Sequence, residues 1–478
     1  MSSCTEVTKT GTPNLSDPTP SANERRTHNP ILPLHHYVPD VEARVYDERV
    51  YLYGSLDLFG HDDWCSHQYR VFSASVEDLS GWTDHGVSFQ SKPTEDDPRD
   101  DVPWSDEILY APDAIRIDDL YYLAFCMAGG GVGLATSAKP EGPFTDAVDL
   151  VFEDGTSIGS IDPTLFVDDD GQPYIYWGQG DIRGAKLEQA PDGRWTGIDQ
   201  SSYNEAVLHH PEHGSGEGAS MRKIGDTYYL AFADDLHPKG EHAIGYSVSK
   251  DPLQGFTYAG AIVHNRDCDV AASNNHGSIC QINGQWYVFY HRQSNATSAT
   301  RRVCVEPIAL DENGRFGHVE MTCQGFGGPL DAYARIQAAW ACRFTGPVNK
   351  VPNRYRNLKR AYNTQWSETS HGITNAHNGN TASFKYLDFG EGHDRPQCVH
   401  ARVRSKEDCA IAIRLDAADG PVVGTLPIAA NGGVEWVQHG AALEQVLEGV
   451  HAVYLEFTGV PDTVLCEIES FQFSRSND

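Results

Sequence analysis

Five segments of the chain share one pattern, in which a polar or acidic residue precedes an alternating apolar stretch, a tight turn and an aromatic-rich run. They are PDVEARVYDERVYLYGS, APDAIRIDDLYYLAF, IDPTLFVDDDGQPYIYWG, GEGASMRKIGDTYYLAF and NHGSICQINGQWYVFYH. Each has two short β-type runs around a turn with an acidic residue or glycine at its tip, which is typical of a β-hairpin. No long helical period lies between the segments, so the sequence predicts an all-β fold.

The spacing of these segments indicates how they assemble. Their leading polar residues are Asp40, Asp113, Asp162, Glu217 and His276, which are 73, 49, 55 and 59 positions apart. Repeats of about 50 to 60 residues with several strands each are typical of propeller blades. We therefore expect a five-bladed β-propeller over residues 28–330, with the five leading residues meeting at one mouth of the central channel.

The acidic members of this set suggest a reaction. An acidic residue that opens a strand is ordinarily a turn or cap residue, but five unrelated turns would not each carry a polar group at one register. Two carboxylates roughly 6.5–9.5 Å apart hydrolyse a glycosidic bond with inversion, one as general base on water and the other as general acid. A third carboxylate nearby can help to keep the acid protonated.

At these motifs the chain resembles glycoside hydrolase family 43, whose catalytic domain is a five-bladed propeller, over roughly residues 28 to 330. The resemblance implies that Asp40 is the general base, that Asp162 tunes and orients the acid, and that Glu217 is the general acid. It implies an inverting, exo-acting hydrolase that releases a terminal pentose, with α-L-arabinofuranose as the leading candidate. β-Xylosidase, endo-arabinanase and galactan- or galactofuranoside-directed activities stay open, because pocket loops decide the substrate.

Two functions that are not enzymatic also stay open. The propeller could bind carbohydrate at its channel mouth without catalysis, or it could be a scaffold for protein partners. The presence of all three carboxylates favours the enzyme over both. An oligosaccharide or polysaccharide is the expected partner, and no cofactor is required.

Further residues follow from the same resemblance. The element YAPDAIRI, with Tyr110 where the family has Trp, makes Asp113 a structural residue near the channel and a candidate substrate contact. His276 is expected in the channel, where it could organise water or ligate a structural calcium or sodium ion. The stretch TSATRRVCVEPI places a substrate-facing arginine at Arg301, and strand alternation then turns Arg302 the other way.

Three tryptophans are candidate walls of a sugar subsite, because the apolar faces of sugars stack on aromatic rings. They are Trp64, Trp104 and Trp177. The alternative for each is packing between blades.

After about Ala334 the chain changes to evenly spaced short strands with glycine-rich turns, which predicts a β-sandwich over residues 334–478. This part resembles carbohydrate-binding module family 6. Gln337 and Ala339 stand where that family has two glutamates for a calcium ion, and Glu467 and Ser470 stand where it has an asparagine and an aromatic residue. We therefore expect a domain that mainly packs on the propeller.

Composition narrows the remaining possibilities. The chain has 36 Lys and Arg against 67 Asp and Glu, a formal net charge of −31, which disfavours binding to nucleic acids or anionic membranes. Residues 1–27 are polar, without the apolar stretch of a secretion signal, and are expected to form a disordered tail. The eleven cysteines have no metal-type spacing, so reduced core cysteines and a cytoplasmic location are expected.

Overall fold

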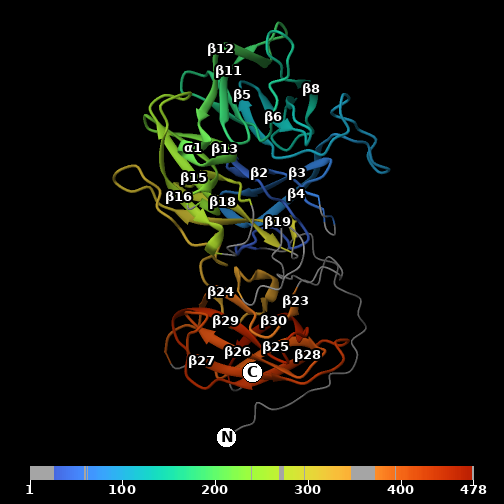
Figure 1. Cartoon of the computed structure of the whole chain (residues 1–478), viewed down its shortest axis with the longest axis vertical. Helices are drawn as coiled ribbons and strands as arrows, with labels where there is room; N and C mark the ends of the chain where they lie inside the picture. Colours follow the sequence, from blue (N-terminus) through green and yellow to red (C-terminus); the bar gives the residue numbers. More distant parts are fainter. Residues whose placement is uncertain are drawn as a thin grey trace.

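Nearly every regular element of the chain is a β-strand, as the sequence predicts. The structure, a computed structural model, describes residues 26–58, 61, 63–237, 239–267, 274–294, 297–345, 372–392 and 395–475. Figure 1 shows two parts, an upper propeller coloured blue to yellow and a lower β-sandwich coloured orange to red. The propeller strands run from Glu42 to Ile308 and the sandwich strands from Leu330 to Ser474. The predicted tail lies outside the described residues, except for its last two positions.

Five antiparallel sheets follow one another along the upper part and form its blades. Blade 1 contains β1 (Glu42–Tyr46), β2 (Arg49–Gly54), β3 (Gln68–Ser75) and β4 (Asp78–Gln90). Blade 2 contains β5 (Asp113–Ile117), β6 (Leu120–Cys126), β7 (Val132–Ser137) and β8 (Thr145–Asp149). Blade 3 contains β9 (Thr164–Val167), β10 (Pro173–Trp177), β11 (Ile182–Gln189) and β12 (Trp195–Leu208). Blade 4 contains β13 (Ser215–Ile224), β14 (Thr227–Leu236), β15 (Lys239–Ser249) and β16 (Thr257–His264). Blade 5 contains β17 (Ser278–Ile282), β18 (Gln285–Ser294) and β19 (Thr297–Ile308). One short helix, α1 (His210–His213), and a 3₁₀ turn at Asn265–Asp267 interrupt the strands.

The first strands of the five sheets form a ring around the channel. β1 contacts β5 and β17, β9 contacts β5 and β13, and β13 contacts β17. Apolar clusters fill the space between neighbouring blades, such as the cluster of Leu165, Ile175 and Trp177 with residues of blade 2. Most residues of these inner strands are buried for this reason.

Blade 5 has three strands, and the N-terminal end of the described chain lies beside its last strand. The Ile31 N–H donates to the Val303 carbonyl (3.2 Å). The Asn29 side chain donates to the Val305 carbonyl (2.9 Å) and accepts from the Val305 N–H (2.8 Å). Residues far apart in sequence therefore hold the ring closed.

The lower part is a sandwich of two sheets. One has the order β20 (Leu330–Asp331), β24 (Thr381–Asp388), β29 (Val450–Gly459), β26 (Cys409–Leu415), β27 (Val422–Ile428), with β22 (Arg343–Thr345) also paired to β24. The other has the order β21 (Ile336–Gln337), β30 (Cys466–Ser474), β25 (Cys398–Ser405), β28 (Val437–Ala442), with β23 (Ile373–Ala376) also paired to β30. A 3₁₀ turn, Ala338–Trp340, follows β21. Phe384 and Val453 of the first sheet pack in one core with Val399 and Phe471 of the second.

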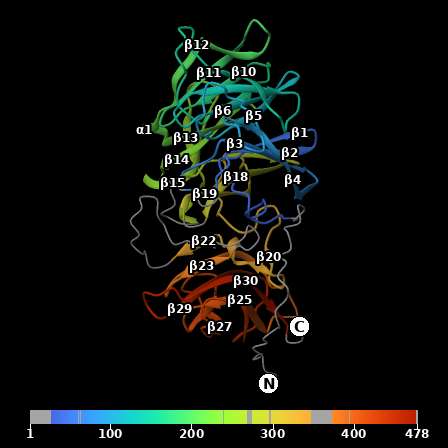
Figure 2. The ribbon, with the colours of Figure 1, turned by 90° about the vertical axis from the view of Figure 1, so that its right-hand side faces the viewer.

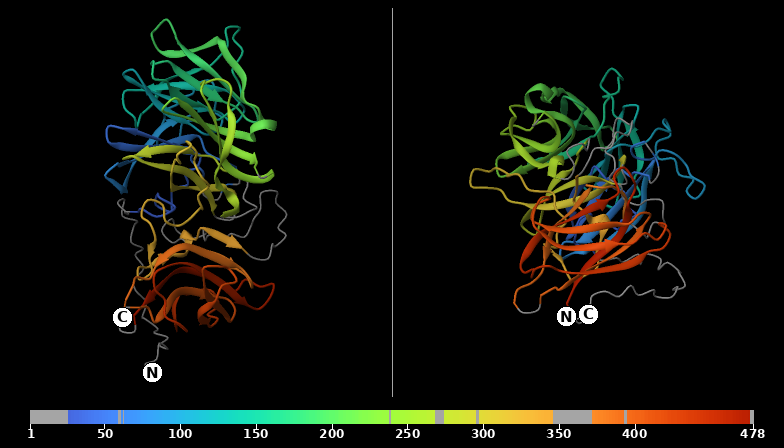
Figure 3. Two further views of the ribbon diagram at one scale, coloured as in Figure 1. Left: turned by 90° about the vertical axis from the view of Figure 1, so that its left-hand side faces the viewer. Right: turned by 60° about the horizontal axis from the view of Figure 1, so that its bottom comes forward.

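The sandwich sits end to end with the propeller, with β20, β22 and β23 on the side that faces it (Figure 2). Figure 3 shows the same arrangement from two further directions. The contacts are both polar and apolar. Tyr386 donates to Glu320 (2.8 Å), which Lys385 also contacts, and Leu34 packs against Ala339.

Two further sequence expectations concern the whole chain. Among the described residues, no helix has the length and apolar character that crossing a membrane requires. In the part of the chain that the structure describes, eight cysteines carry free thiols, and all of them except the half-buried Cys409 are buried. Cys398 is disulfide-bonded, so the expectation of reduced cysteines does not hold for this residue.

Candidate active site

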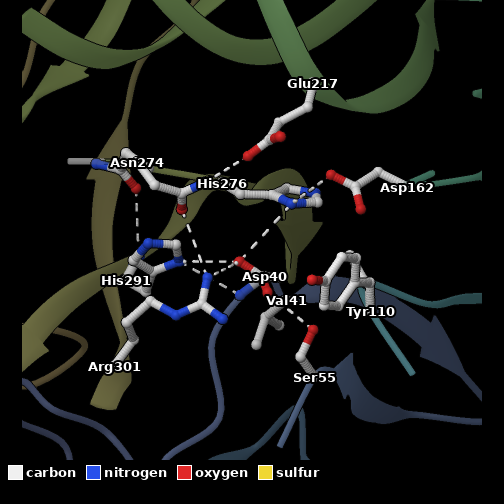
Figure 4. Close-up of polar contacts among 12 residues, drawn as sticks. Asp40, Val41, Ser55, Tyr110, Asp162, Glu217, Asn274, His276, His291 and Arg301 are labelled. Carbon is white, nitrogen blue, oxygen red and sulfur yellow. Dashed lines mark hydrogen bonds and ion pairs between the residues drawn. The ribbon is translucent and has the colours of Figure 1, made fainter. Parts of the chain in front are cut away.

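Four of the five leading residues meet at one end of the channel. Asp40 precedes β1, Asp162 precedes β9, Glu217 lies near the start of β13, and His276 precedes β17. His276 Nδ1 lies 3.7 Å from Asp40 Oδ1 and 3.6 Å from Asp162 Oδ2. Figure 4 shows the three carboxylates pointing toward one another around the imidazole ring. The predicted convergence is therefore present for four of the five residues, whereas Asp113 is engaged by Arg44, Thr164 and Leu165.

The backbone turns two of these aspartates into the channel. Asp40 has a φ of 57° and Asp162 a φ of 54°, in the left-handed region, immediately before their inner strands. Aspartate tolerates this conformation better than most residues, because its short polar side chain bonds locally. The Pro-Asp and Asp-Pro elements thus place a carboxylate where ordinary strand geometry would not.

Asp40 is held as a carboxylate. Its side chain accepts hydrogen bonds from Ser55 Oγ (2.8 Å) and Arg301 Nη1 (2.8 Å), and His291 Nδ1 lies 3.3 Å from Oδ1. Burial alone would raise the pKa of Asp40, but Arg301, His291 and His276 outweigh burial and hold the pKa well below its usual range. A carboxylate that stays ionised at neutral pH is suited to act as a general base.

A second aspartate fixes the arginine that contacts Asp40. The backbone N–H and Nε of Arg301 both donate to Asp57 Oδ2 (2.9 Å each), and Nη2 donates to Asp57 Oδ1 (2.9 Å). Asp57 in turn accepts from the Cys65 N–H (3.0 Å). This arrangement leaves Nη1 directed at Asp40.

The neighbouring Arg302 points the other way, as strand alternation predicts. Its guanidinium donates to the Leu34 carbonyl (2.7 and 3.0 Å) and lies over the Tyr37 ring. Arg301 itself is 3 % exposed and its donors are engaged by carboxylates. It therefore positions Asp40, whereas the resemblance predicted that it faces the substrate.

Asp162 has the opposite electrostatic environment from Asp40. It is buried, and its backbone N–H contacts Cys126 Sγ (3.1 Å). Burial raises its pKa well above the usual value, and the nearby charges of Glu217 and Asp40 raise it further. The expectation was a negatively charged neighbour of the acid. The structure instead favours the neutral form, because two carboxylates share its poorly solvated space.

Glu217 lies nearer the solvent than the two aspartates. Gln179, which is exposed, donates to Glu217 Oε2 (3.0 Å), and Asn274 donates to Oε1. Asn274 Oδ1 also lies 3.5 Å from Arg301 Nη1. Asn274 and Arg301 therefore form a bridge between Glu217 and Asp40, which have no direct contact.

The glycine after Glu217 explains the Glu-Gly pair of the fourth segment. Gly218 has a φ of 68°, and a Cβ atom there would lie 2.6 Å from His276 Cδ2. Only glycine leaves room for the imidazole while it keeps Glu217 at this place.

Two predicted substrate contacts need correction. Asp113 is fully buried and accepts from Arg44 Nη2 (2.6 Å), Thr164 Oγ1 (2.9 Å) and the Leu165 N–H (2.8 Å). It joins the inner strands of blades 1, 2 and 3 and has no surface for a sugar. Trp177 has no exposed surface either and donates its indole N–H to the Ile158 carbonyl (3.1 Å).

The other two tryptophans stay predictions. Trp104 is 42 % exposed and Trp64 is half-buried, so both rings have surface that a sugar could reach.

Five side chains of the site were missed in the sequence: Ser55, Asp57, Gln179, Asn274 and His291. Hairpin register could have identified two of them. β1 and β2 pair Glu42 with Tyr53, so two residues further out Ser55 faces Asp40. β17 and β18 pair Ser278 with Phe289, so in the same way His291 faces His276.

The surroundings of His276 bear on the expectation that it ligates a cation. Among the described residues, no group of three or more His, Cys, Asp and Glu side chains is arranged to hold a metal ion. His276 would thus have to share an ion with water and main-chain oxygens.

Comparison with known proteins identifies the upper part. The family model described as "Glycosyl hydrolases family 43" matches residues 27–316, more than half of the chain. The chain belongs to this family. It is thus a glycosidase of family 43 with its three acidic residues at the mouth of a five-bladed propeller. The family model described as "Carbohydrate binding module (family 6)" matches residues 357–475.

Individual relatives of this family 43 protein cover nearly its whole length. A protein of Thermoclostridium stercorarium named "Xylosidase/arabinosidase" is 31 % identical over 91 % of this chain and 97 % of its own length. An "Arabinoxylan arabinofuranohydrolase" of Paenibacillus polymyxa is 27 % identical over 93 % of this chain and 74 % of its own. The crystal structure of a family 43 arabinoxylan arabinofuranohydrolase from Bacillus subtilis, in complex with cellotetraose, is 26 % identical, covers 94 % of this chain and 97 % of that chain, and has a TM-score of 0.51.

Proposed function

We propose that this protein is an inverting, exo-acting glycosidase that releases a terminal pentose, α-L-arabinofuranose, from an oligosaccharide or polysaccharide. The observation that carries the proposal is the convergence of Asp40, Asp162 and Glu217 around His276, with Asp40 held ionised. The names of the full-length relatives support the choice of sugar.

The contacts suggest a role for each group. Asp40, fixed by Arg301 and Ser55, would take a proton from the attacking water. Glu217, which lies nearer to solvent, would protonate the leaving oxygen on the other side of the sugar ring. The bridge through Asn274 and Arg301 separates the two carboxylates and so supports a mechanism with room for water between base and sugar. Asp162, being disposed to stay neutral, would position the acid and the sugar by hydrogen bonding.

A β-xylosidase is the second candidate, because the relative from Thermoclostridium stercorarium carries both activities in its name. The 4-nitrophenyl glycosides of α-L-arabinofuranose, β-D-xylose and β-D-galactofuranose separate these possibilities. We expect the arabinofuranoside to give the highest kcat/KM, and proton NMR of the first product to show the inverted anomer. Faster hydrolysis of the xyloside would favour the second candidate, and a retained anomer would contradict the mechanism.

A propeller that only binds carbohydrate would hydrolyse none of these substrates. Binding of arabinose or xylose oligosaccharides without turnover of any aryl glycoside would favour a carbohydrate-binding function over glycosidase activity.

A further inference from the structure

A small cavity on the sheet that contains β30, β25 and β28, on the face away from the core, is lined mainly by polar and cationic side chains. Its volume is about 280 Å³. The lining residues are Arg335, His400, Arg402, Gln438, Ser470, Phe471 and Gln472. They come from β25, β28, β30 and the segment before β21, so rigid strands hold most of them.

The pairing of these strands places the polar groups on one face. Arg402 of β25 is paired with Ser470 of β30 on one side and with Gln438 of β28 on the other. His400, two residues earlier, is paired with Gln472. Residues two apart on a strand share a face, so a row of hydrogen-bonding side chains faces the cavity.

The charge in the cavity is not balanced. Arg335 donates to Glu469 and to Ser470 Oγ (2.9 Å), and Arg402 Nη1 lies 3.2 Å from the same Glu469. Two guanidinium groups therefore share one carboxylate, which leaves one positive charge in a chain whose formal net charge is −31.

The two guanidinium groups can also reach a ligand. Their side chains are 48 % and 36 % exposed, whereas Glu469 is 12 % exposed. Each guanidinium has more N–H donors than these contacts use. The fixed fork of such donors matches both oxygens of a carboxylate.

The cavity lacks the surface that neutral glycans require. Neutral sugars are gripped largely by stacking on exposed aromatic rings, but Phe471, the aromatic residue among the lining residues, is 2 % exposed. The amides of Gln438 and Gln472 can instead bond hydroxyl groups next to a bound carboxylate.

We propose that this cavity binds an acidic saccharide, with the carboxylate of a uronic-acid residue on Arg335 and Arg402 and its hydroxyls on the neighbouring amides. The site is separate from the channel mouth, and the proposal holds whichever pentose the propeller releases.

The test compares glucuronoxylan, polygalacturonate and carboxyl-reduced glucuronoxylan as ligands of the full chain in affinity electrophoresis at low salt. The full chain carries Glu217→Gln, so that the polymers are not cut. The carboxylates at the channel mouth do not attract a uronate, so stronger retention of glucuronoxylan than of its reduced form reports on the cavity. Whichever acidic polymer is held more strongly identifies the uronic acid.

Arg402→Gln is the informative variant, and Arg395→Gln is its control, because Arg395 is an exposed arginine of the same domain that pairs with Glu448. We expect Arg402→Gln to weaken binding of the acidic polymer roughly tenfold, the effect of losing a charged hydrogen bond, and Arg395→Gln to change it little. Added NaCl should weaken the carboxylate-dependent part. Melting temperatures check that both variants fold. Equal retention of the reduced and acidic polymers, unchanged binding by Arg402→Gln, or no binding of either acidic polymer would overturn the proposal.

Discussion

A single residue, Arg301, keeps Asp40, the proposed base, ionised. Its guanidinium is the main group that opposes the effect of burial on Asp40. In Arg301→Gln the pKa of Asp40 should rise, because burial then acts with less opposition. The base must be ionised to work, so the acid limb of the kcat/KM profile should move to higher pH, and kcat should fall. A pH–rate profile with an arabinofuranoside measures both changes.

Arg302→Gln is the matched control, since Arg302 is equally buried but bonds the Leu34 carbonyl on the other side of β19. It should lower the melting temperature without moving the acid limb. An acid limb that stays in place in Arg301→Gln, or that moves as far in Arg302→Gln, would contradict the assigned role.

Asp162 makes stability depend on pH in a direction that can be measured. Its pKa in the folded protein is raised, while the unfolded chain has an ordinary pKa near 3.8. The folded state therefore binds more protons between these two values, and this group's contribution to stability falls as the pH rises above about 4. Asp162→Asn removes this penalty. Thermal unfolding from pH 4 to 8 should show a variant that gains stability over the wild type as the pH rises, although its activity is low. A constant difference across this range would argue against a raised pKa.

Among the elements, the β13–β14 hairpin offers a test of how closely the site is packed. Gly218→Ala would bring a Cβ atom against the His276 ring, and Gly225→Ala, in the turn of the same hairpin, would meet open space at a similar positive φ. Both substitutions should cost about 1–2 kcal/mol for the backbone conformation. Only Gly218→Ala should also reduce kcat, because the imidazole must move. Unfolding curves and kcat for the two variants separate these effects, and equal kcat values would show that the contact does not matter.

The hairpins also show how much of the fold and of the site could be predicted from the sequence. The five repeats, their aromatic second strands and the spacing of Asp40, Asp162 and Glu217 follow from local pattern, and the fold confirms them. Ser55 and His291 were within reach, since register alone places them opposite known residues. Gln179 and Asn274 were not, because loops bring them to Glu217 and no periodicity marks those positions. For Trp177 the alternative of packing between blades holds, because the residue ends the second strand of blade 3 and is fully buried. In sequence, an aromatic residue at this place looks the same whether it faces a sugar or the next blade.

For the whole molecule, the sandwich should stabilise the propeller. It covers Leu34 and provides Lys385 and Tyr386 as partners of Glu320. A chain that ends at Gly328 would expose this apolar surface and leave Glu320 without those partners. We expect its melting temperature to fall by several degrees, or the protein to become poorly soluble. Differential scanning calorimetry of the full and shortened chains measures this, and equal melting temperatures would mean that the two parts are energetically independent.

The proposed mechanism depends on the division of labour between Asp40 and Glu217, which leaving-group dependence can separate. Asp40→Ala and Glu217→Ala should each lower kcat on an arabinose-substituted oligosaccharide by at least about 10²-fold, the loss typical of acid–base catalysis. A 4-nitrophenyl leaving group needs little protonation. On the aryl arabinofuranoside, therefore, Glu217→Ala should recover much of its activity while Asp40→Ala stays equally impaired. Equal losses on both substrates for Glu217→Ala, or recovery by Asp40→Ala, would contradict these roles.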